Sequence, residues 1–164
     1  MFDNQFIARV ALQVAGPQAT DISTFDRADG GYLTVGFGPV LTYCRTPRPV
    51  LTRHRAFTQA LRAARGLFPA DYRAPLPTRS QELPGHPVII AITAQDDDAC
   101  KLTAYTASGS RDCRPALVVT IGALTLNIRD LQAAQDLHDV WNTALNHAPG
   151  LWQPTERSQT VSTV

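Results

Sequence analysis

Several residue types are scarce in this chain of 164 residues, and each shortage excludes something. Only one of the fifteen basic residues is a lysine, Lys101, and there are only three cysteines, without a C-x-x-C pair. An odd number of cysteines without that spacing argues against a disulfide framework and favours reduced thiols in the cytoplasm. The sequence leaves open whether Cys100 and Cys113 pair at the base of a hairpin.

Long apolar runs are also missing. No segment approaches the roughly 18 apolar residues of a membrane-spanning helix. The first residues, MFDNQFIARV, lack the basic start and the apolar stretch of a signal peptide. We therefore predict a cytoplasmic protein that does not enter a membrane.

No familiar catalytic or nucleotide-binding motif is present: the chain has no P-loop, G-x-G-x-x-G, G-x-S-x-G or H-E-x-x-H. The acidic run DDDAC at 96–100 is interpreted as a charged turn between strands rather than as a cation site. Cys44 is interpreted as a small core residue rather than as a nucleophile. We therefore expect no enzymatic activity, no cofactor and no bound metal.

An internal duplication is the strongest pattern that is present. When residues 33–68 are placed on 117–152, an offset of 84, ten of the 36 positions are identical without a gap. Phe57 and Phe68 meet tryptophans at the matching positions, and His54 meets His138. A weaker match relates ISTF at 22–25 to LTAY at 102–105. The sequence therefore predicts two copies of one structural unit.

A glycine marks the middle of a hairpin in each copy. The apolar alternation of YLTVGF breaks at Gly38-Pro39, and that of ALVVTI breaks at Gly122-Ala123. Glycine in the first central position is typical of a two-residue turn with positive φ. A two-residue turn pairs Phe37 with Val40 in the first copy; a continuous strand with a bulge is the competing interpretation.

The predicted fold class is α+β. Each copy has the order strand, strand, strand, strand, helix, with antiparallel sheets and helices packed on them around a pseudo-two-fold axis. We predict one domain over 1–152, built from repeats at 5–68 and 87–152. A Pro-rich linker at 69–86 joins them, and a flexible tail covers 153–164. Gly66 is expected to end the first helix; Asp130 and Pro149-Gly150 are expected to begin and end the second.

Charge is not duplicated. Residues 45–79 contain eight arginines and one acid, Asp71, a net charge of +7 that leaves −6 for the rest of the chain. The second helix region instead carries Asp130, Asp136 and Asp139. The basic region either holds phosphates, or is a solvated helix face, or pairs with acidic helices of a second copy.

Two ββββα units in one chain resemble the architecture of the Whirly and PUR-repeat proteins, in element order over residues 5–152. That resemblance implies binding of single-stranded nucleic acid through open sheet faces, and assembly into dimers or larger oligomers. The SsgA-like proteins, which act in cell division and sporulation, are similar in shape. No family motif is matched, so no binding residue is transferred from these families.

The residues themselves support such an activity, because single-strand binders combine a basic groove with aromatic platforms. Tyr32, Phe25 and Tyr105 are further aromatic residues on or near strands. We predict a non-catalytic protein that binds single-stranded nucleic acid through a sheet face and the Arg-rich first helix. The residues expected to make contact are Arg45, Arg48, Arg53, Arg55, Arg62, Arg65, Tyr43 and Thr34.

Two alternatives remain. The first is a protein–protein adaptor or a self-assembling structural protein, of the division, sporulation or mobile-element accessory type, with no role at nucleic acid. The second is an enzyme or a metal site at His54 and His138, which are otherwise interpreted as residues bordering the core.

Overall fold

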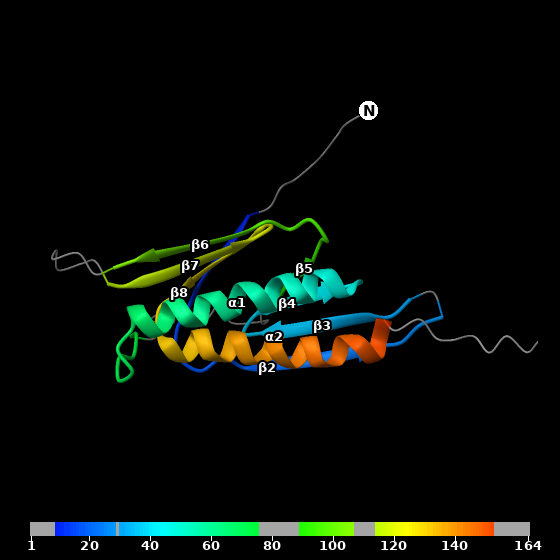
Figure 1. The fold of residues 1–164 in the computed structure, drawn as a ribbon, viewed down its shortest axis with the longest axis horizontal. Coiled ribbons are helices and arrows are strands. Elements are labelled where there is room, and N and C mark those ends of the chain that lie inside the picture. Colours follow the sequence, from blue (N-terminus) through cyan, green and yellow to red (C-terminus); the bar gives the residue numbers. More distant parts are fainter. Residues whose placement is uncertain (1–8, 29, 76–88, 107–113, 153–164) are drawn as a thin grey trace, which may run out of the picture.

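The computed structural model describes residues 9–28, 30–75, 89–106 and 114–152. They form an α+β fold in which four strands and a helix occur twice, as the sequence predicts (Figure 1). The first copy contains β1 (Val10–Val14), β2 (Thr20–Phe25), β3 (Tyr32–Phe37), β4 (Val40–Cys44) and α1 (Pro47–Leu67). The second contains β5 (Ile90–Thr93), β6 (Cys100–Tyr105), β7 (Ala116–Ile121), β8 (Leu124–Ile128) and α2 (Leu131–Trp152).

Both predicted hairpins are confirmed. Phe37 pairs with Val40 across the β3–β4 turn, and Ile121 pairs with Leu124 across the β7–β8 turn. Gly38 has a φ of 49° and Gly122 a φ of 57°, in the region that L-residues with side chains seldom occupy. The continuous-strand interpretation is therefore wrong, because the chain reverses at each glycine.

The two copies exchange their first strands. The first sheet has the order β2-β3-β4-β5, and the second sheet has the order β1-β8-β7-β6. One edge strand of each sheet thus comes from the other copy. This strand pairs in parallel with its neighbour, β5 with β4 and β1 with β8. The sheets are mainly antiparallel, as expected, and each adds one parallel pair that the sequence did not predict. A parallel neighbour needs a long connection, and the chain reaches β5 only after all of α1 and the segment that follows it.

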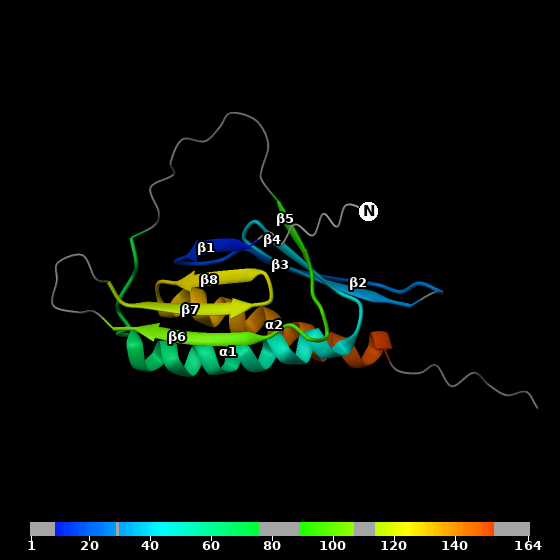
Figure 2. The same cartoon turned by 90° about the horizontal axis from the view of Figure 1, so that it is seen from above.

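The helices are exchanged as well. α1 packs on β6 and β7 of the second sheet, and Figure 2 shows it beside β6. α2 packs instead on β2 and β3 of the first sheet. The two helices run side by side in opposite directions (Figure 1). His54 faces His138 with ring centroids 6.0 Å apart, and Phe57 stacks on Trp141 at 6.3 Å with an interplanar angle of 8°. Residues that match at the offset of 84 meet here, so the predicted pseudo-two-fold axis passes between the helices.

The core lies between the helices and the inner faces of both sheets. The inward positions of the two hairpins are buried, as their alternation predicts. Cys44 is 0% exposed, which agrees with its interpretation as a core residue. The largest fully buried side chains include Trp141, Phe57, Leu33 and Leu117.

The predicted helix ends are partly right. Asp130 caps α2, because its Oδ1 accepts a hydrogen bond of 2.9 Å from the N–H of Ala133. Pro149-Gly150 does not end this helix, which continues to Trp152 with Pro149 inside it. The last turn is held from outside, since Trp152 Nε1 donates a hydrogen bond of 3.2 Å to the carbonyl of Gly31. α1 likewise passes Gly66 and ends at Leu67.

Parts of the predicted domain plan lie outside the described residues. Within the predicted linker, residues 69–75 belong to no helix or strand, and residues 76–86 are not described. The predicted tail at 153–164 is also outside the described ranges, as is Cys113, whose pairing with Cys100 the sequence leaves open. Neither described helix is sufficiently long and apolar to cross a membrane.

Candidate nucleic-acid interface

Three aromatic side chains lie together on the face of the first sheet that points away from the helices. Phe25 on β2 and Tyr32 on β3 are direct cross-strand partners, and their rings stack at 4.5 Å with an interplanar angle of 13°. Tyr43 on β4 lies 6.2 Å from Tyr32 at an angle of 40°. Period-two alternation produces this cluster, because all three residues fall on outward positions of adjacent strands.

Two arginines flank these rings. The guanidinium of Arg27, just beyond β2, lies 5.4 Å from the ring centroid of Tyr32, at cation–π distance. Arg45 follows the last residue of β4. These residues surround a pocket of about 420 Å³, which we call the aromatic–arginine pocket. Its described lining is Arg27, Gly30, Gly31, Tyr32, Tyr43 and Arg45.

The end of α2 holds one wall of this pocket. Trp152 donates its indole N–H to the carbonyl of Gly31, and a Cβ at Gly31 would collide with the side chain of Leu151. Gly30 has a φ of 120°, which side-chain-bearing residues avoid. The wall is therefore backbone only, and it depends on residues more than a hundred positions away in the sequence.

Two predicted contact residues are not available at the surface. Thr34 is only 5% exposed, and it lies between its cross-strand partners Ser23 and Tyr43. Arg53 is 4% exposed and forms an ion pair of 2.6 Å with Asp98. The prediction that these two side chains contact nucleic acid is corrected, because neighbouring residues cover both of them.

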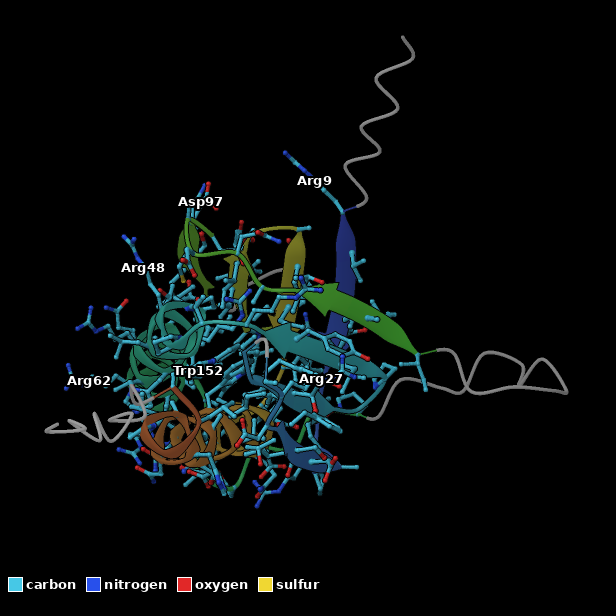
Figure 3. All side chains as sticks on the ribbon, turned by 90° about the vertical axis from the view of Figure 1, so that its right-hand side faces the viewer. Arg9, Arg27, Arg48, Arg62, Asp97 and Trp152 are labelled. Atoms are coloured by element: carbon cyan, nitrogen blue, oxygen red, sulfur yellow. The ribbon has the colours of Figure 1, made fainter. Side chains whose placement is uncertain are left out.

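The other predicted arginines of α1 are exposed. Arg48, Arg55 and Arg62 are spaced seven residues apart, so they form one stripe with roughly 10 Å between neighbours along the helix axis. Arg65 is exposed one turn further on. We call these four residues the α1 arginine stripe. Figure 3 shows Arg48 and Arg62 projecting outward from α1 at the left edge of the molecule, whereas Arg27 lies nearer its middle.

The second copy has neither feature. The positions that match Phe25, Tyr32 and Tyr43 are Tyr105, Ala116 and Asn127, so only one aromatic remains on the second sheet. The positions that match the α1 arginine stripe are Gln132, Asp139, Asn146 and Pro149. The fold does not require these side chains, because the same unit is built without them.

Sequence reasoning included Tyr43 and Arg45 in the site and named Tyr32 and Phe25 as stacking candidates, but it missed Arg27 and the Gly30-Gly31 wall. Arg27 is two residues beyond a strand whose last residue, Phe25, points outward. That spacing was a weak signal. No pattern in the sequence indicated that α2 would reach back to Gly31.

The residues considered for chemistry lie outside the aromatic–arginine pocket. His54 and His138 are half-buried at the axis, and His138 Nδ1 lies 2.9 Å from Asp139 Oδ1. Asp98 of the acidic run pairs with Arg53, and Thr46 hydrogen-bonds to Asp96. Across the described ranges, no group of three or more His, Cys, Asp or Glu is placed to hold a metal ion.

Neither described cysteine is suited to nucleophilic attack at neutral pH. Burial raises the pKa of the Cys44 thiol to about 11, and the nearby charge of Arg53 only partly opposes this effect. Partial burial also raises the pKa of the Cys100 thiol, at the start of the edge strand β6. Because the thiolate is the reactive form, both thiols are poor nucleophiles.

An apolar groove crosses the helix layer where α1 begins and α2 ends. Its volume is about 490 Å³, and its described lining is Pro47, Arg48, Leu51, Leu145, Ala148, Pro149 and Trp152. Trp152 therefore contributes to this groove and also holds the wall of the aromatic–arginine pocket.

Comparisons with known proteins give no match: no family model fits the chain, and neither curated proteins nor solved structures include a significant relative.

Proposed function

We propose that this protein binds single-stranded nucleic acid without catalysing a reaction, mainly through the outer face of the first sheet. The observation that carries the proposal is the aromatic–arginine pocket, where two tyrosine rings and the side chains of two arginines line one concavity. Exposed aromatic rings stack on unpaired bases, and arginines hold phosphates through paired hydrogen bonds. A double helix keeps its bases stacked on each other, so an unpaired strand is the better ligand.

The α1 arginine stripe supports a second contact in the same proposal. The described residues of α1 include no acid, so its outward surface carries a single sign of charge. A strand long enough to leave the pocket meets Arg48 soon after Arg45, because β4 and α1 are separated by only two residues. We also propose that the chain is similar in architecture to the Whirly and PUR-repeat proteins and that it assembles into a homo-oligomer.

The test is the binding of labelled single-stranded DNA, RNA and duplex DNA, measured by fluorescence anisotropy at low and moderate salt. We expect single strands to bind more tightly than the duplex, with an affinity that falls steeply with salt. Tyr43→Ala and Arg45→Ala should each weaken binding about tenfold, because the first removes one base-stacking contact and the second removes one phosphate contact.

The duplication supplies the matched control. Arg129 is the position that matches Arg45, and it directly follows β8 of the second sheet, which lacks the aromatic cluster. Arg129→Ala removes the same charge and should leave the affinity nearly unchanged. Equal losses in Arg45→Ala and Arg129→Ala would mean that only net charge matters, and absence of binding at low salt would overturn the proposal.

A second candidate function is self-assembly as an adaptor or structural protein, which the apolar groove favours. The occupant that fits best is a second copy of the chain. Arg55 and Asp139 occupy matching positions on the two helices and have opposite charges. α1 of one molecule therefore complements α2 of a second molecule. Light scattering should then show a dimer that Leu51→Asn dissociates; a monomer at all concentrations would exclude this candidate.

A further inference from the structure

We infer that the aromatic–arginine pocket holds one unpaired nucleotide, with its base on Tyr43 and its phosphate between Arg27 and Arg45. This inference rests on the proposed function and goes beyond it. Sheet-face binders generally take a run of bases along an open surface. Here the geometry points instead to a concave subsite for a single nucleoside monophosphate, either free or within a strand.

The size of the pocket is the first argument. Sites for small molecules and cofactors are concave, with volumes of about 300–1,000 Å³. The aromatic–arginine pocket, at about 420 Å³, is at the small end of this range. This volume suits one base with its sugar and phosphate.

The arrangement of the rings selects the platform. Tyr32 is already stacked on Phe25, and the guanidinium of Arg27 lies over its ring. Tyr43 also lines the pocket and is tilted by 40° from Tyr32, which leaves no parallel slot between the two tyrosines. A base therefore stacks on Tyr43 alone, rather than inserting between two rings.

The charges place the phosphate. The described lining contains two arginines and no acidic residue, so its electrostatic preference is for an anion. Arg27 belongs to the β2–β3 connection and Arg45 to the β4–α1 connection, so the two guanidinium groups approach from different segments. In the described part of the chain, neither side chain is engaged in an ion pair with a protein carboxylate.

The glycine wall keeps the space open. A Cβ at Gly30 would meet no atom within 4 Å. A Cβ at Gly31 would collide with Leu151, and the carbonyl of Gly31 accepts the hydrogen bond from Trp152. The backbone can therefore approach a ligand closely at this wall. Trp152 is a positioning residue here, because it fixes the carbonyl of Gly31 without itself lining the pocket.

The experiment compares adenosine 5′-monophosphate, adenosine and inorganic phosphate, each by isothermal titration calorimetry and as a competitor of labelled single-stranded DNA. We expect the monophosphate to bind and compete, and adenosine and phosphate to be at least about tenfold weaker, because each lacks one of the two contacts. Tyr43→Ala and Arg27→Ala should reduce monophosphate binding, whereas Arg129→Ala should not.

The outcomes separate this inference from the proposed function. If the DNA binds in a Tyr43-dependent way but the monophosphate neither binds nor competes, the single-nucleotide subsite is wrong and the sheet-face function stands. If phosphate competes as well as the monophosphate, the pocket is only an anion site and the inference is wrong. If nothing binds at low salt, the proposed function fails together with the inference.

Discussion

Arg53 is a charged residue at a buried position of α1, where the second copy has a hydrophobic residue. Its match in the second copy is Leu137, which is 0% exposed. Arg53 is accommodated because Asp98 reaches it from the β5–β6 turn and because its guanidinium lies 5.8 Å from the ring centroid of Trp141. A buried arginine without such a partner would strongly destabilise the fold. The pair therefore links α1 to the turn that precedes β6.

Cys44 leads to a prediction about pH. Its pKa is raised by burial to about 11 in the folded protein, from an ordinary value of 9.0. Above pH 9 the unfolded chain loses this proton and the folded chain keeps it, so the free energy of unfolding falls as pH rises from 9 towards 11. From pH 7.5 to pH 10 we expect a loss of about 1 kcal/mol from this group.

Urea unfolding of the wild type and of Cys44→Ala at the two pH values measures this loss. The variant should lose about 1 kcal/mol less than the wild type between pH 7.5 and pH 10, because the titrating thiol is gone. The comparison cancels the other cysteines, which titrate in both proteins. Equal losses in both proteins would mean that the Cys44 thiol is not desolvated in the folded state.

At the scale of elements, each hairpin depends on one glycine with positive φ. The turn fixes the register, and a shift by one residue would expose every inward side chain of the strand. Phe37, Val40 and their counterparts in β7 and β8 are buried only in the observed register. The glycine is thus required by the turn, and the turn by the core.

Gly38→Val should destabilise the protein by about 1–2 kcal/mol, because a β-branched residue disfavours the φ of 49° seen at this position. Thermal or urea unfolding measures the change. The matched control is Gly66→Ala in the last turn of α1, where a Cβ meets nothing within 4 Å. There the higher helix propensity of alanine should stabilise the protein by up to about 1 kcal/mol. A Gly38→Val variant as stable as the wild type would contradict the turn.

At the scale of the molecule, exchange makes the two copies interdependent. Each sheet takes its fourth strand from the other copy, and each helix covers the other copy's sheet. Neither copy alone can bury its apolar surfaces as the whole chain does. This arrangement favours the interpretation of the chain as one domain rather than two.

Cutting the chain between the copies tests that interpretation. With a protease site placed in the segment at 76–88, cleavage should leave two polypeptides that elute together in size-exclusion chromatography and unfold in one transition. Either polypeptide produced alone should lack a cooperative unfolding transition, because its sheet lacks a strand and its helix has no sheet to cover. Two separately folded halves would contradict the exchange.

The sequence by itself determined the features that depend on neighbouring residues. The two units, the α+β class, both glycine turns, their strand register and the Asp130 cap all follow from local spacing, alternation and turn chemistry. Local patterns suffice there because each feature is formed within a few residues of the chain. The sequence also placed Tyr43 and Arg45 in the candidate site, since outward strand positions can be counted from the turn.

Only the tertiary structure decided which sheet receives each first strand and each helix. The two copies share one apolar pattern, so β1 and α1 fit either sheet equally well as far as the pattern shows. The same limit explains the burial of Arg53 and Thr34, whose covering residues come from other strands and turns. It also explains the aromatic–arginine pocket, whose glycine wall is held by Trp152 from the far end of the chain.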